Sequence, residues 1–106
     1  EGTIYFEYDK YNLSASAVSD IRALANSIKS SSSKVRIEGH CDERGTREYN
    51  LALGEKRANV VSELLQVNGV SSSSITTVSY GEEKPVTYGS NESSWSKNRR
   101  AVVKVL

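Results

Sequence analysis

The pattern of hydrophobic and polar residues marks four short segments of the chain as strands. Residues 3–6 join Thr, Ile, Tyr and Phe, and residues 35–39 alternate with period two between apolar or small residues and charged ones. The runs 75–79 and 101–106 are rich in β-branched residues, which favour extended backbone. These four segments predict the strands of one sheet.

Two segments between these strands repeat apolar residues at steps of three and four, which indicates helices with one buried face. The first helix is expected to begin at Ser14 or Ser16, and the second at Thr46, because all three are residues that cap helix N-termini. The second helix runs to about Asn68, where Gly69 closes it. The apolar positions are Ala17, Val18, Ile21, Leu24, Ala25 and Ile28 in the first helix, and Leu53, Val60, Val61 and Leu64 in the second.

The order of these elements predicts an α/β two-layer sandwich of the form β-α-β-α-β-β, with two main helices on one face of a four-stranded sheet. A polar segment, residues 80–99, joins the last two strands, and a loop of this length predicts a short helix at 92–98. The chain of 106 residues fits a single domain covering residues 1–106.

One charged residue interrupts the apolar stripe of the second helix. Arg57 lies four residues after Leu53 and three before Val60, so the helix directs a guanidinium toward the interior, where a charge requires a partner. Asp42 leaves the end of the second strand just before this helix, so we expect the two side chains at one mouth. From residue types alone, the pair is either a structural ion pair or the centre of a ligand site.

Other chemistry finds little support in the sequence. His40 and Cys41 have no second His or Cys to complete a zinc site, and no Gly-x-Ser-x-Gly motif or phosphate-binding glycine loop is present. We therefore predict no metal, no cofactor and no enzyme. Alternation along the strand places His40 on the side of Asp42, as a hydrogen-bonded buried residue, and directs Cys41 away from the mouth.

The composition adds three limits. A formal charge of +1, from 14 basic and 13 acidic residues, offers no broad footprint for nucleic acid. No apolar run is long enough to span a bilayer, and the single Cys cannot form an internal disulfide. Because the first residue is not Met, we expect a mature fragment that has lost an export signal or anchor.

Several motifs in order resemble the OmpA-like peptidoglycan-binding domain family. The central one is Gly-His-Cys-Asp-Glu-Arg-Gly-Thr at 39–46, followed by Tyr-Asn at 49–50, Leu-Gly at 53–54 and Arg-Ala at 57–58. The segments 5–10, 79–85 and 96–102 resemble the opening strand, the late loop and the last strand of the family. Cys41 replaces the usual small residue or Thr, and Glu7-Tyr8 replaces Asp-Phe. The resemblance implies a mixed sheet.

The resemblance also implies a ligand, the meso-diaminopimelate of the peptidoglycan stem peptide. The free end of this residue carries an ammonium and a carboxylate, which the family pattern assigns to Asp42 and Arg57 respectively. The same pattern places Asn50, Leu53, Tyr8 and Asp9 next to them as ligand-binding residues.

Partners and location follow from the resemblance in the same way. It implies a monomer in the periplasm, held to the outer membrane by a lipid anchor on an N-terminal segment, that tethers this membrane to peptidoglycan. A second implied partner is TolB, the β-propeller protein of the Tol system, at Glu43, Arg44, Gly45 and Thr46. The alternatives are the domain of an OmpA-type porin or a flagellar stator, or a protein-interaction domain in which Asp42 and Arg57 are structural.

Overall fold

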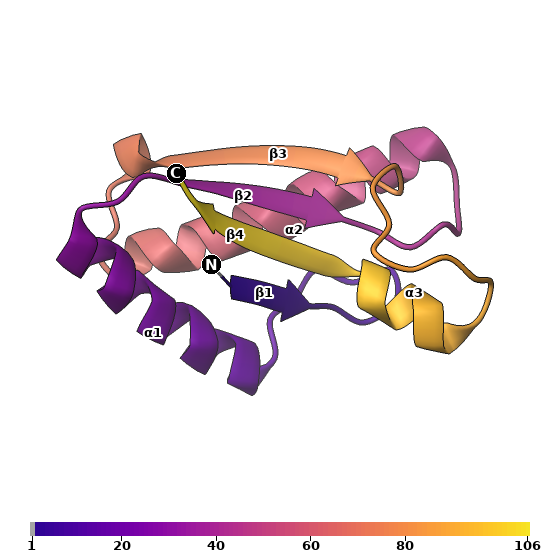
Figure 1. Ribbon diagram of the computed structural model, residues 1–106, viewed down its shortest axis with the longest axis horizontal. Helices are drawn as coiled ribbons and strands as arrows, with labels where there is room; N and C mark the ends of the chain where they lie inside the picture. The colour runs from indigo at the N-terminus through magenta and orange to yellow at the C-terminus, as the bar shows by residue number, and fades with distance from the viewer. Residues whose placement is uncertain (1) are drawn as a thin grey trace.

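The computed structural model describes residues 2–106 and contains the predicted elements in the predicted order (Figure 1). The short helix expected in the loop before the last strand is present, and a single 3₁₀ turn precedes the third strand. The elements are β1 (Gly2–Tyr5), α1 (Ala15–Ser31), β2 (Val35–His40), α2 (Arg47–Val67), the 3₁₀ turn (Ser72–Ser74), β3 (Ile75–Gly81), α3 (Glu92–Asn98) and β4 (Arg100–Val105).

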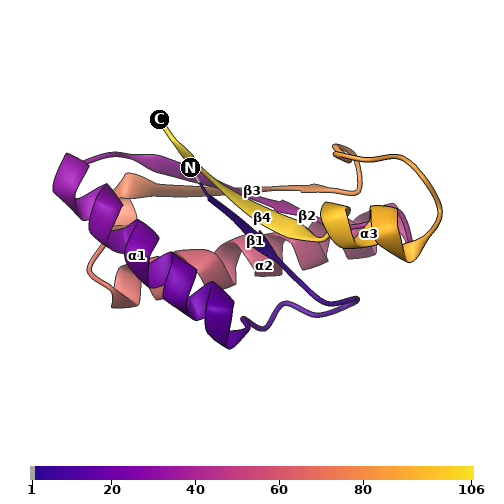
Figure 2. The same ribbon diagram turned by 60° about the horizontal axis from the view of Figure 1, so that its bottom comes forward.

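The four strands form one mixed sheet in the order β1-β4-β2-β3. β2 and β3 are parallel, whereas β4 runs antiparallel to both β1 and β2. The long helices α1 and α2 lie on the same face of this sheet, and α3 lies at the end where β1 and β2 finish (Figures 1 and 2). The predicted two-layer α/β sandwich is confirmed.

The core lies between the two long helices and the sheet. The first helix buries the predicted stripe in large part, and its N-cap is Ser14, whose Oγ accepts from the Ala17 amide at 3.1 Å. Because burying a large aliphatic side chain contributes about 1.5–3 kcal/mol, this layer carries most of the stability. Its buried apolar residues are Ile4, Phe6, Ala17, Ile21, Ala25, Ile28, Val35, Ile37, Ala58, Val61, Leu65, Val70, Ala101 and Val103.

Two glycines set the distance between α2 and the sheet. A Cβ added at Gly39 of β2 would overlap the Gly54 carbonyl of α2, and a Cβ added at Gly54 would overlap the Ser79 hydroxyl of β3. The backbones of helix and strand therefore approach without intervening side chains. This close approach brings the end of β2 against the first turns of α2, where the candidate site lies.

His40 is buried but lacks the predicted hydrogen bonds. It is 2% exposed, and neither ring nitrogen has a hydrogen-bond partner among the described residues. Its Nε2 lies 3.7 Å from Glu38 Oε1, and its ring is 5.4 Å from the Tyr80 ring. Burial, followed by the positive charge of Arg100, lowers the pKa of His40 to about 4, so the residue is neutral at pH 7.

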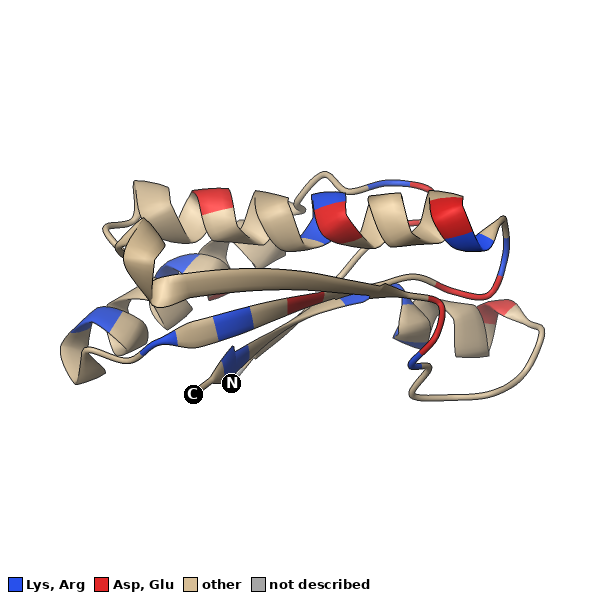
Figure 3. Ribbon diagram, turned by 90° about the horizontal axis from the view of Figure 1, so that it is seen from above, with Lys and Arg blue, Asp and Glu red and all other residues tan. Residues whose placement is uncertain are grey.

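Charges of both signs are interspersed along the outward side of α2 (Figure 3). Within residues 2–106, no helix combines the length and the apolar character that crossing a bilayer requires.

Candidate ligand-binding site

A pocket of about 240 Å³ opens where the segment after β1, the end of β2 and the first turns of α2 meet. All six side chains predicted to hold the ligand line it, together with two residues of the predicted partner segment. The lining residues are Tyr8, Asp9, Cys41, Asp42, Arg44, Gly45, Tyr49, Asn50, Leu53 and Arg57.

Arg57 is the largest fully buried side chain and is 1% exposed. Its guanidinium donates to three backbone carbonyls: Nε to Lys10 at 2.9 Å, Nη1 to His40 at 2.9 Å and Nη2 to Glu7 at 3.1 Å. It therefore joins α2 to the end of β2 and to the segment after β1. Burial lowers the pKa of Arg57, as expected for a cation removed from water, although the group stays charged.

The structural ion pair between Arg57 and Asp42, one of the two possibilities from the sequence, is absent. Every ion pair among the described residues leaves Arg57 out, and the charge of Arg57 is met by carbonyls alone. A guanidinium carries five N–H groups, so two remain beyond the three that these carbonyls accept. The pocket is thus lined by a buried cation that lacks an anionic partner.

Asp42 pairs instead with two other arginines. Its Oδ1 accepts from the Arg44 amide at 3.0 Å and from Arg44 Nε at 3.2 Å, while its Oδ2 accepts from Arg44 Nη2 at 2.8 Å and lies 3.5 Å from Arg99 Nη1. Burial by itself would raise the pKa of Asp42, but the Arg44 hydrogen bonds and the two positive charges outweigh it and lower the pKa. Asp42 is therefore an anion at neutral pH although it is 3% exposed.

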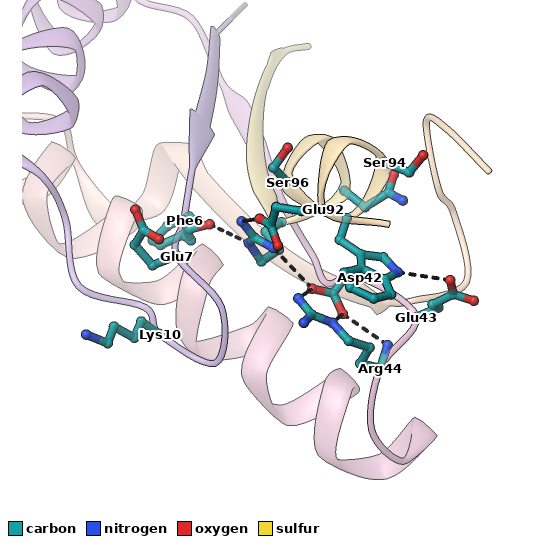
Figure 4. Close-up of polar contacts among 12 residues, drawn as sticks. Phe6, Glu7, Lys10, Asp42, Glu43, Arg44, Glu92, Ser94 and Ser96 are labelled. Carbon is teal, nitrogen blue, oxygen red and sulfur yellow. Dashed lines mark hydrogen bonds and ion pairs between the residues drawn. The ribbon is translucent and has the colours of Figure 1, made fainter. Parts of the chain in front are cut away.

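Arg44 lies between two aromatic rings. The centre of its guanidinium is 3.9 Å from the ring centroid of Tyr8 and 3.9 Å from that of Trp95, which belongs to α3. Both rings lie over the guanidinium. Asp42 accepts hydrogen bonds from its edge (Figure 4). The predicted ligand residue Tyr8 thus lines the pocket while its ring stacks on Arg44.

The predicted partner segment, residues 43–46, is mainly exposed, with Arg44 half-buried. Glu43 accepts from Trp95 Nε1 at 3.0 Å and from the Ser90 hydroxyl at 2.8 Å, and these hydrogen bonds lower the pKa of Glu43. Thr46 is the N-cap of α2, as predicted, because its Oγ1 accepts from the Tyr49 amide at 3.1 Å.

The predicted ligand residues Asn50 and Leu53 are buried on the α2 side of the pocket. Asn50 Nδ2 donates to the Arg44 carbonyl at 2.9 Å and to Glu82 Oε1 at 3.0 Å, so it fixes the loop between β2 and α2. On the opposite rim, the exposed Asp9 adopts a left-handed backbone with φ of 56° and accepts a hydrogen bond from the Tyr49 hydroxyl.

The prediction that Cys41 faces away from the mouth is wrong. Cys41 lines the pocket, is 4% exposed, and its Sγ donates to the Asn50 carbonyl at 3.3 Å. The error arose because β2 ends at His40, after a register shift between Gly39 and His40, so strand alternation does not extend to residues 41 and 42, and both line the pocket. Burial raises the pKa of the Cys41 thiol to about 11, so the thiol is neutral and unreactive at pH 7.

Arg99 belongs to the site, although it was not among the predicted ligand residues. Arg99 contacts Asp42, and it also donates to the Phe6 carbonyl at 2.8 Å and to Glu92 Oε1 at 2.6 Å. Neither it nor Trp95 stands out by sequence spacing, because each reaches the site only through the fold.

The chain belongs to the OmpA family, whose pattern matches residues 5–99. Among curated proteins, it is 49% identical over 102 residues to the peptidoglycan-associated lipoprotein of Pseudomonas aeruginosa, covering 96% of this chain and 61% of that protein. It is 48% identical to that of Pasteurella multocida over 102 residues, covering 95% and 68%. The chain thus spans about three fifths of the length of the Pseudomonas relatives that it matches.

Solved structures give the same grouping. The crystal structure of the peptidoglycan-associated lipoprotein from Burkholderia pseudomallei superposes with a TM-score of 0.96 at 40% identity, over 100% of this chain and 91% of that one. The C-terminal domain of Helicobacter pylori MotB reaches a TM-score of 0.91 at 19% identity, over 100% and 84%. This second likeness shows a shared fold.

Proposed function

We propose that this domain binds peptidoglycan noncovalently through the free end of meso-diaminopimelate in the stem peptide, and carries out no chemistry on the polymer. The family and the names of its relatives support peptidoglycan as the ligand. In this proposal the domain tethers the outer membrane to the cell wall.

The observation that carries the proposal is the uncompensated charge of Arg57. Burying a cation without an anion is costly. Arg57 lines the pocket and has two N–H groups beyond the three bonded to carbonyls, and a carboxylate complements such a cation better than any neutral group does. A carboxylate entering the pocket supplies the missing counter-charge. Because Asp42 lines the same pocket, the site offers one charge of each sign, which is the complement of a zwitterion.

The size of the pocket fits the end of one amino-acid residue. Pockets for drug-sized ligands measure about 300–1,000 Å³, and this one holds about 240 Å³. We therefore assign the recognised element to the diaminopimelate side-chain end, and leave the glycan strand outside.

The test varies the ligand, so that the fold stays untouched. Calorimetric titration compares three stem peptides, with diaminopimelate, with its side-chain carboxylate amidated, and with lysine. The last two leave Arg57 without an anion, so we expect affinities weaker by at least about tenfold, or ~1.4 kcal/mol. Equal affinities would show that Arg57 is structural only. Co-sedimentation with purified sacculi checks binding to the intact polymer, and a domain that stays in the supernatant favours the rival function, a protein-interaction domain.

We also propose that residues 43–46 contact TolB, and that the domain is monomeric and lies in the periplasm on an N-terminal lipid anchor. The exposure of Glu43, Gly45 and Thr46 supports such a surface. Because Arg44 and Gly45 also line the pocket, partner and ligand should compete. Unchanged TolB affinity at saturating peptide would contradict this. The full-length N-terminus separates the lipoprotein from a porin or a stator, since it would carry a lipid-attachment Cys, a β-barrel or a membrane-spanning helix respectively.

A further inference from the structure

Asp42 has almost no acceptor capacity left for a ligand. A carboxylate offers about four lone-pair positions. Arg44 fills three with its backbone amide, Nε and Nη2, and Arg99 Nη1 lies 3.5 Å from Oδ2. While the Arg44 side chain keeps both of its bonds, an incoming ammonium therefore finds at most one free position on Asp42, on the Oδ2 that faces Arg99.

We infer that the Arg44 guanidinium occupies, in the free domain, the place on Asp42 that the ligand ammonium takes in the complex, and that ligand binding moves Arg44 away from Asp42. Arg44 is then a specificity-determining residue, because only a ligand that brings its own cation can replace it. This inference rests on the proposed function.

Of the two arginines on Asp42, Arg44 is the one free to move. Its side chain is 28% exposed and comes from the loop between β2 and α2. The Arg99 side chain is 6% exposed and is anchored on the Phe6 carbonyl and on Glu92 (Figure 4). Displacement of Arg99 would leave a buried carbonyl without a donor, whereas displacement of Arg44 exposes its charge to water.

The aromatic rings lower the cost of this displacement. Tyr8 and Trp95 stack on the faces of the Arg44 guanidinium, whereas Asp42 is bonded along its edge. The contacts with the rings are thus independent of the contacts with Asp42. Arg44 can release Asp42 and shift along the rings, so that its charge keeps an aromatic contact while its position over Trp95 changes.

The first test compares Arg44→Gln with Arg47→Gln by calorimetric titration of the diaminopimelate stem peptide. Both variants lose one positive charge near the start of α2, but Arg47 pairs with the exposed Glu83 and does not line the pocket. If Arg44 competes with the ligand, Arg44→Gln should bind at least about threefold more tightly than wild type, because the competing state is removed. Arg47→Gln should change affinity by less than about twofold.

Weaker binding by Arg44→Gln would show that Arg44 contacts the ligand, and equal binding would show that Arg44 does not compete with it. Either result would overturn the inference. If wild type binds the peptide and Arg44→Gln binds it no more tightly, the inference fails but the proposed function stands. Binding by neither protein overturns both, and binding by Arg44→Gln alone supports the competition.

A second test needs no variant. Trp95 is the only Trp of the chain and stacks on Arg44, so its fluorescence reports the position of this side chain. We expect the diaminopimelate peptide to change Trp95 emission along the same binding curve as calorimetry. A peptide whose side-chain amine is acetylated brings no cation to Asp42. At concentrations where calorimetry still detects its binding, this peptide should leave the Trp95 emission unchanged. The same emission change with both peptides would overturn the inference.

Discussion

Replacement of Arg57 by lysine keeps the positive charge and removes the fork of N–H donors. The Arg57 guanidinium donates to carbonyls of three separate segments, at 2.9, 2.9 and 3.1 Å. A lysine ammonium reaches one of these carbonyls, so about two hydrogen bonds to a charged donor are lost, each contributing about 1.5–3 kcal/mol. Because water from the adjacent pocket can solvate the freed carbonyls in part, we expect the free energy of unfolding to fall by about 2–4 kcal/mol.

The effect of Arg57→Lys on binding is separate from its effect on stability. The ligand carboxylate loses bidentate recognition, so affinity for the diaminopimelate peptide should fall by at least about tenfold. Truncation by Arg57→Ala should cost more, on the order of 2–5 kcal/mol, because it leaves the ligand charge unpaired.

Urea unfolding followed by Trp95 fluorescence measures the first quantity, and calorimetry at a temperature where the variant is folded measures the second. Arg36→Lys is the matched control, because Arg36 pairs with Glu38 outside the pocket and its side chain is 39% exposed. This control should alter stability by less than about 1 kcal/mol. Unchanged affinity and unchanged stability in Arg57→Lys would refute the assignment of both roles to the fork.

Three further predictions concern neighbouring residues. Cys41→Ser should keep folding and peptide binding, whereas Cys41→Leu should fill the pocket and weaken binding by about tenfold or more in calorimetry, because Cys41 lines it. The pKa of His40 is about 4 in the folded domain and 6.5 ordinarily, so the unfolded chain binds the proton more readily. The contribution of neutral His40 to the free energy of unfolding is complete above pH 6.5 and falls by up to about 3 kcal/mol as the pH drops to 4. Urea unfolding at several pH values should show this fall, and His40→Gln should reduce the pH dependence. Gly54→Ala should lower the free energy of unfolding by about 1–3 kcal/mol in the same urea experiment, because the added methyl overlaps the Ser79 hydroxyl; an unaltered urea transition would contradict this.

The roles of Arg57 in stability and in binding have a common origin. The residue holds the segment after β1, the end of β2 and helix α2 together, and the pocket opens at this junction. The three hydrogen bonds to carbonyls also fix the orientation of the two Arg57 N–H groups that bond no carbonyl. The site is therefore preorganised, and a ligand carboxylate need not pay for ordering the guanidinium.

The order and type of the elements were readable from the sequence, because they depend on local periodicity and capping. Ser14 and Thr46 cap the two long helices as predicted, and the stripe of α1 faces the core. The position of Arg57 within the stripe of α2 predicted a buried charge beside Asp42, and both residues line one pocket.

What only the tertiary structure decided is which groups satisfy these charges. Arg57 bonds to backbone carbonyls up to 50 residues away, and every residue type carries such a carbonyl, so no sequence pattern marks the acceptors. Asp42 lies beside Arg57 at the pocket yet pairs with Arg44, two residues on, and with Arg99, which the strand order brings from the far end of the chain. Hydrogen-bond partners in a buried site depend on distances of a few tenths of an ångström between separate segments, and these distances are fixed only when helix α2 packs on the sheet.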